Sequence, residues 1–74
     1  MDSEAVLGFW FSDRVRHRWF RPTPALDREI RERFLPLWRL AAEGRLRTWE
    51  SDPRGALALV ILLDQFPLNM FRNQ

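Results

Sequence analysis

The stretch Asp52–Arg72 constrains this chain more than any other, because it contains eight consecutive apolar residues, Ala56 to Leu63. The run is far shorter than the roughly 20 apolar residues that span a bilayer, so it does not predict a membrane helix. Apolar side chains are driven out of water, and the run must therefore be buried by other parts of the chain. The remaining segments are expected to pack around it.

A helix is the structure that this stretch predicts. Asp52 followed by Pro53 is a helix-start signal, because the aspartate caps free backbone amides and proline suits the first helical position. The Ala and Leu content favours a helix over a strand, and no other segment offers a partner strand. We expect a helix from Pro53 to about Gln65 that stops at Phe66, before Pro67. Because it is apolar all round, it is expected to be covered on every side.

Two further helices are predicted N-terminal to this one. The first runs from about Glu4 to Ser12, with Ser3 as its capping residue. The second begins at Thr23 with another cap-plus-proline signal, runs from Pro24 to Glu43, and ends before Gly44. With the central helix, these segments predict an all-α fold of three helices.

The second of these helices is amphipathic. Its apolar stripe recurs at steps of four and three residues and consists of Leu26, Ile30, Phe34, Leu37 and Ala41. Its other face is charged, and two acid-first pairs at i, i+4 spacing are predicted there, Asp27 with Arg31 and Glu29 with Arg33. We therefore expect the stripe to face the core and the charged pairs to face solvent.

Composition indicates one small domain, residues 1–74. The chain has no cysteine, which excludes disulfides and thiolate metal sites. Acidic Asp2 and Glu4 stand where a secretory signal would carry positive charge, so a cytoplasmic protein is predicted. All 12 basic residues are arginine and the net charge is only +2. The high sequence pI therefore reflects the absence of lysine and tyrosine, and it does not indicate a strongly basic surface.

An arginine-rich segment, Arg14–Pro22, interleaves four arginines with Trp19 and Phe20. Arginine binds phosphates and aromatic rings stack on bases, so contact with nucleic acid is one interpretation. The interpretation we prefer is that Trp19 and Phe20 fold back into the core while the arginines are solvated. His17 has no clustered partner ligands and no glycine-rich phosphate loop is present, so neither a metal site nor a cofactor is predicted.

Asp64 is the residue of the central stretch that most suggests a site, because a carboxylate at the end of an apolar helix needs a compensating partner. One interpretation is a structural ion pair with Arg72, completed by the amides of Gln65 and Asn69. The other is that these four side chains converge on a pocket for a small polar or anionic ligand. No base, nucleophile or metal cluster accompanies them, so no catalytic residue is assigned and enzymatic activity stays open.

Three blocks of the sequence stand out: Val6–Phe11, the spacing Asp27-x-x-Ile30-x-x-x-Phe34, and above all LALVILLDQFPLNMFR, Leu57–Arg72. Together they resemble the bacterial domain-of-unknown-function family 924. The resemblance implies an all-helical domain whose superhelical arrangement is similar to tetratricopeptide repeats, and it implies no reaction. Where the family typically has arginine after Asp-Gln-Phe-Pro, this chain has Leu68. Family members also continue beyond the equivalent of Arg72, so the resemblance implies a truncated, N-terminal part of the domain.

These observations predict a non-enzymatic interaction domain that presents helical surfaces to a protein or peptide. The alternative, from a different class, is a ligand-binding or enzymatic domain centred on Asp64, Gln65, Asn69 and Arg72. Three helices cannot cover the apolar run completely, so we expect an exposed apolar face through which the chain self-associates. The residues expected at that face are Leu59, Leu62, Leu63, Phe66, Met70 and Phe71.

Overall fold

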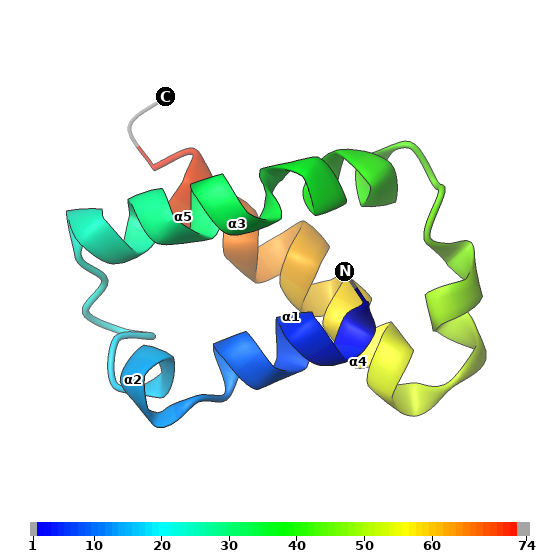
Figure 1. Ribbon diagram of the computed structural model, residues 1–74, viewed down its shortest axis with the longest axis horizontal. Helices are drawn as coiled ribbons and strands as arrows, with labels where there is room; N and C mark the ends of the chain where they lie inside the picture. The colour runs from blue at the N-terminus through cyan, green and yellow to red at the C-terminus, as the bar shows by residue number, and fades with distance from the viewer. Residues whose placement is uncertain (1, 73–74) are drawn as a thin grey trace.

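The computed structural model describes residues 2–72, and every regular element within them is helical (Figure 1). In chain order the elements are α1 (Ser3–Trp10), α2 (Asp13–Arg16), α3 (Pro24–Ala42), the 3-10 turn η1 (Arg47–Ser51), α4 (Pro53–Val60), the π-helical turn η2 (Ile61–Gln65) and α5 (Phe66–Met70). The predicted all-α class is confirmed. Within residues 2–72, none of the helices combines the length and the apolar composition that crossing a bilayer requires.

The last three elements, α4, η2 and α5, form one continuous helical rod. In the view of Figure 1 the rod lies behind α1 and α3 and crosses both of them diagonally. α1 packs against α4, and α3 packs against η2 and α5. The rod is therefore the central element around which the other helices are arranged, as the apolar run predicts.

Side-chain caps start the helices close to where the sequence predicts them. Thr23 accepts a hydrogen bond from the backbone N–H three residues on at 3.1 Å, and Asp52 does the same at 2.8 Å. Both cap-plus-proline signals are therefore confirmed. α1 is capped by Asp2 rather than by the predicted Ser3. Ser12, predicted to lie at the end of the first helix, instead caps the short helix α2.

Three phenylalanine rings join the principal helices at the centre of the molecule. Phe9 comes from α1, Phe34 from α3 and Phe66 from the rod. The ring centroids of Phe34 and Phe66 lie 4.7 Å apart, and those of Phe9 lie 5.0 Å and 6.0 Å from them. All five residues of the predicted α3 stripe are buried around this cluster, so the predicted core face of α3 is confirmed.

The helical path does not end at Phe66, which corrects the prediction made from Pro67. A proline inside an α-helix collides with the carbonyl four residues earlier, here that of Leu63. In η2 the N–H of Phe66 bonds instead to the carbonyl of Ile61, five residues earlier. This wider π turn accommodates the proline ring, and α5 continues to Met70.

The rod is not covered on every side, which corrects a second prediction. Leu57, Val60 and Leu63 recur every three residues and are 45%, 54% and 45% exposed; we call this side the outer face. Figure 1 shows α1 and α3 in front of the rod, and Leu57 lies at the edge of this face beside α1, where it lines a hollow with Leu7 and Phe11. Three residues predicted at the open surface are buried instead, namely Leu62, Phe66 and Met70.

The arginine-rich segment follows the prediction for Trp19 but not for Phe20. The Trp19 ring stacks on Trp10 with centroids 5.3 Å apart, and its Nε1 donates to the Trp10 carbonyl at 3.1 Å. Phe20 is 93% exposed, because Trp19 occupies the position against α1 and leaves its neighbour in solvent. A fully exposed phenylalanine beside exposed arginines is therefore a feature of this surface.

Gly55 and Gly8 provide a matched test of how closely α4 packs against η1. A Cβ added to Gly55 would collide with the backbone carbonyl oxygen of Trp49, whereas no atom lies within 4 Å of a Cβ added to Gly8. Gly55→Ala is expected to destabilise the fold by about 1–3 kcal/mol. Gly8→Ala is expected to stabilise it by about 0.5–1 kcal/mol through helix propensity. Urea denaturation measures both, and equal effects of the two changes would contradict the close approach of α4 to η1.

Two bidentate ion pairs link the elements at the surface. Arg14 of α2 donates to both oxygens of Glu29 of α3 at 2.7 and 2.8 Å. Arg54 of α4 donates in the same way to Glu4 of α1 at 2.7 and 2.8 Å. The hydrogen bonds from Arg14 hold the pKa of the Glu29 carboxyl below its ordinary value of 4.5. These pairs link α2 to α3 and α4 to α1.

The depressed pKa of Glu29 predicts that the free energy of unfolding depends on pH. A carboxyl whose pKa is lower in the folded chain stabilises it at pH values above the unfolded pKa, and that contribution disappears as pH falls through the folded value. The free-energy difference between wild type and Glu29→Gln should therefore be present at neutral pH and vanish well below pH 4.5. Glu32→Gln, on an exposed part of the same helix, is the control. A difference that persists unchanged in acid would refute the assignment.

Candidate functional site

The four residues that the sequence groups as a site lie at different places on the rod. Asp64 is exposed in η2, and no hydrogen bond or ion pair to it is formed within residues 2–72. The predicted pair between Asp64 and Arg72 is wrong, because Arg72 Nε donates to Asp27 Oδ2 of α3 at 2.8 Å. The rod turns Asp64 toward the outer face and Arg72 toward α3, so the two charges have different surroundings.

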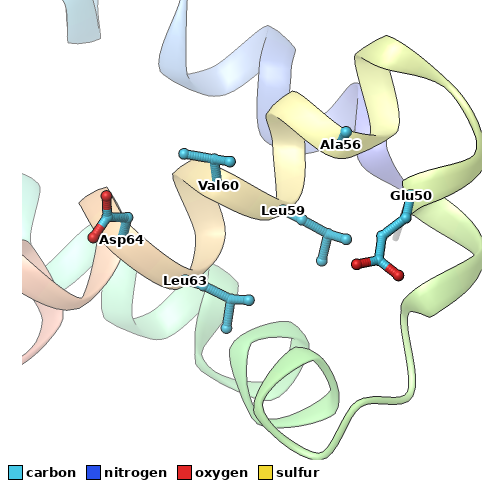
Figure 2. A pocket seen from close by; sticks show the side chains of 6 residues that line it. All are labelled: Glu50, Ala56, Leu59, Val60, Leu63 and Asp64. Carbon is cyan, nitrogen blue, oxygen red and sulfur yellow. The ribbon is translucent and has the colours of Figure 1, made fainter.

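Asp64 lines an apolar groove on the outer side of the rod. The groove has a volume of about 450 Å³ and is lined by Glu50, Ala56, Leu59, Val60, Leu63 and Asp64. Figure 2 shows Leu59 and Leu63 pointing the same way, toward the side on which Glu50 lies, with Asp64 at the opposite end of the row. The groove therefore has apolar walls and one carboxylate near each end.

Asn69 and Arg72 both bind Asp27. Asn69 Nδ2 donates to Asp27 Oδ1 at 2.9 Å, and Arg72 Nε donates to Asp27 Oδ2 at 2.8 Å. The Asn69 residue is only 8% exposed, and the side chains of Asp27 and Arg72 are 16% and 43% exposed. Each carboxylate oxygen has one donor, so this polar cluster fastens the end of the rod to the first turn of α3.

Asp27 is the member of the cluster that sequence reasoning missed. Its i, i+4 spacing predicts a pair with Arg31, but Arg31 Nη1 donates to the Met70 carbonyl at 2.9 Å instead. Asp27 directly follows Leu26, the first residue of the buried stripe. A polar residue at the edge of a core-facing stripe can contact the neighbouring helix, and that position was the available signal. The other predicted pair, Glu29 with Arg33, is present at 3.4 Å.

Two hollows meet at Asn69 and Arg72. The first, about 640 Å³, we call the arginine hollow; it is lined by Pro22, Pro24, Asp27, Arg28, Arg31, Asn69, Met70 and Arg72. The second, about 530 Å³, we call the aromatic hollow; it is lined by Trp10, Trp19, Phe20, Pro22, Gln65, Pro67, Leu68, Asn69, Phe71 and Arg72. The structure thus brings Gln65, Asn69 and Arg72 to one surface and leaves Asp64 outside it.

The side chains of this surface are suited to binding. Amides and guanidinium groups donate hydrogen bonds, and the aromatic rings offer flat apolar contact. Within residues 2–72, no three His, Asp or Glu side chains are grouped so that they could hold a metal ion. His17 lies at the end of α2, where its Nδ1 is 2.6 Å from the Asp13 carbonyl oxygen, and it belongs to neither hollow.

Comparison with protein-family models covers almost the whole chain. The model described as "Bacterial protein of unknown function (DUF924)" matches residues 6–74. The chain belongs to the DUF924 family. The resemblance carried by the three sequence blocks is therefore confirmed. No curated protein and no solved structure matches this DUF924 chain.

The polar cluster of the DUF924 chain yields a stability prediction with a matched pair. Asp27→Ala removes the acceptor of the buried Asn69 amide, and we expect a loss of about 1–3 kcal/mol. Most of this loss should come from Asn69, because Arg72 is partly exposed and keeps its hydration. Asp64→Ala should change stability by no more than about 0.5 kcal/mol. Chemical denaturation of both variants measures the difference. An equally large loss for Asp64→Ala would contradict the exposed position of Asp64 in the structure.

Proposed function

We propose that the chain is a protein-interaction domain that binds an amphipathic helix along the apolar groove and the outer face of the rod. The single observation that carries the proposal is the row Leu57, Val60 and Leu63, about half exposed at three-residue spacing. An amphipathic helix presents apolar side chains at the same periodicity, and its apolar face can lie in such a groove. The tetratricopeptide-like arrangement implied by the family resemblance, itself still a prediction, would present helices to partners in this way.

Burial of this row provides a moderate driving force. Full burial of a Val or Leu side chain is worth about 1.5–3 kcal/mol, so covering three half-exposed ones contributes on the order of 3 kcal/mol before the costs of association. Those costs are several kcal/mol. The apolar row alone therefore supports weak binding, and additional polar contacts are needed for affinity and for choice of partner.

The carboxylates of Glu50 and Asp64 supply the polar contacts and select the partner. Neither of them forms an ion pair within residues 2–72. Figure 2 places them at opposite ends of the row of groove side chains. A helix with arginine or lysine at its two ends would place a cation at each carboxylate, and complementary charge favours both encounter and register. The partner proposed is therefore a basic amphipathic helix.

A second copy of this chain is a poorer occupant of the same groove. If two outer faces met, each would bring its own Glu50 and Asp64 to the contact, whether the rods ran parallel or antiparallel. Like charges would then face one another at both ends. Self-association, expected from the sequence, stays a prediction, and the charges favour a different partner. The alternative of one ligand-binding or enzymatic site built from all four of Asp64, Gln65, Asn69 and Arg72 is supported less, because Asp64 lies apart from the other three.

A designed peptide tests the proposal. The probe is a labelled helical peptide of about 18 residues, or about five turns, with leucines on one face and arginine at both ends. The control peptide is identical except for glutamate in place of arginine. We expect the basic peptide to bind at least about tenfold more tightly by fluorescence anisotropy, and the difference to shrink in high salt. Equal affinity for the two peptides would contradict the proposal.

Variants of the chain locate the contact. Val60→Asp places a charge in the outer face and should abolish binding of the basic peptide. Leu68→Asp is the control, because Leu68 is also exposed on the rod but lies outside the groove. Sedimentation velocity of the unliganded chain completes the test. A dimer that dissociates in Val60→Asp but not in Leu68→Asp would identify a second copy as the occupant and overturn the choice of a basic helix.

A further inference from the structure

We propose that this chain also binds an aromatic phosphate ester across the arginine and aromatic hollows. In this site the arginine hollow holds the phosphate and the aromatic hollow holds the ring, with Asn69 and Arg72 at the junction. The site uses α3, α5, the segment after α2 and Gln65 at the end of η2, whereas the proposed helix-binding groove uses η1, α4 and the earlier residues of η2, and no residue lines both. The two proposals are independent, and either can fail without the other.

The charge of the arginine hollow favours an anion. Arg28, Arg31 and Arg72 line it, and Asp27 is the one acidic residue in its lining. Three guanidinium groups and one carboxylate leave an excess of positive charge in a concave surface, where a phosphate dianion is attracted from solution. The carboxylate of Asp27 is 16% exposed, and both of its oxygens already accept hydrogen bonds. It therefore repels an incoming anion less than a free carboxylate would.

Donors remain available in the hollow for such an anion. Arg72 uses Nε to bind Asp27, and no bond from its two terminal nitrogens is formed within residues 2–72. Arg31 uses Nη1 on the Met70 carbonyl, which leaves its other nitrogens for a ligand. Arg28 is exposed and forms no ion pair within the same residues. Guanidinium forks match the geometry of phosphate oxygens, so these groups are suited to one phosphate.

The aromatic hollow supplies an apolar surface beside this charge. Phe20 and Leu68 both line it and are 93% and 62% exposed. No ring packs against Phe20 within residues 2–72, whereas Trp19 beside it is stacked on Trp10. An aromatic ring in water gains by stacking against another flat ring, and such contacts tolerate different ring types. Gln65 on the same wall offers an amide to a ring nitrogen or oxygen.

The junction of the hollows determines the class of ligand. Pro22, Asn69 and Arg72 line both of them, so the charged and the apolar surfaces are continuous. Inorganic phosphate would use only the first surface, and an uncharged ring only the second. A flat ring joined to a phosphate uses both, and linking the two contacts in one molecule strengthens binding. Nucleoside monophosphates and aryl phosphates share this chemistry.

Calorimetric titration of the full chain tests the site with four probes. These are adenosine monophosphate, phenyl phosphate, adenosine and inorganic phosphate. We expect saturable binding of the two esters, at least about tenfold tighter than that of adenosine or inorganic phosphate. Binding of neither ester would overturn the proposal. Equal affinity for inorganic phosphate and the esters would overturn it as well, since the ring would then contribute nothing.

Three variants locate the contacts, and exposed positions are chosen so that folding is preserved. Arg28→Gln removes one phosphate donor, and Phe20→Ala removes the stacking surface. Each should weaken ester binding by about tenfold. Phe20→Ala should leave the weak affinity for inorganic phosphate unchanged. Arg39→Gln, on an exposed part of α3 outside both hollows, should leave ester binding unchanged. If it weakens binding as much as Arg28→Gln does, the attraction is a general property of arginines and the site is refuted.

Discussion

The contact of Phe66 with Phe9 and Phe34 is the interaction on which the rest of this structure depends. It is the point at which the rod meets both α1 and α3, and Phe66 is fully buried there. Asn69 and Arg72 follow three and six residues later, on the side of the rod that faces α3. Burial of the Phe66 ring therefore sets the rotation of α5, and this rotation places both donors at Asp27. Hydrophobic packing thus positions the polar surface.

The same packing divides the rod into two sides with different chemistry. The side against α1 and α3 is filled with apolar side chains and ends in the polar cluster at Asp27. The other side keeps Leu57, Val60 and Leu63 in solvent, with Glu50 and Asp64 beside them. An acidic, apolar surface and an arginine-lined, aromatic surface consequently occur on one small domain of the DUF924 family. Their opposite charges suit them to different kinds of partner.

Local signals in the sequence predicted the helices well, but contacts between segments far apart in the sequence were harder to predict. The starts at Thr23 and Asp52 depend on a cap and a proline that act within one turn, and the α3 stripe depends on a regular period. The partner of Arg72 could not be found this way, because Asp27 lies 45 residues away in sequence. Phe20 was misplaced for a similar reason, since only one of two adjacent aromatic residues could pack against α1. The residues on the open side of the rod were only partly predicted, because an apolar run does not reveal from which directions it is covered.

The π turn at Ile61–Gln65 has a consequence for how the length of this segment can vary. A π turn contains one residue more than the α-helical turn that it replaces, so it is equivalent to an insertion within a helix. Deleting one residue there would restore an α-helical turn and leave the two halves of the rod in nearly the same rotation, because a π turn and an α turn each complete about one revolution. Phe66 and Asn69 would still face α3. Deleting a residue from α4 instead would rotate the rest of the rod by about 100°, the angle per residue of an α-helix, so a change of length disturbs the packing less at the π turn than in α4.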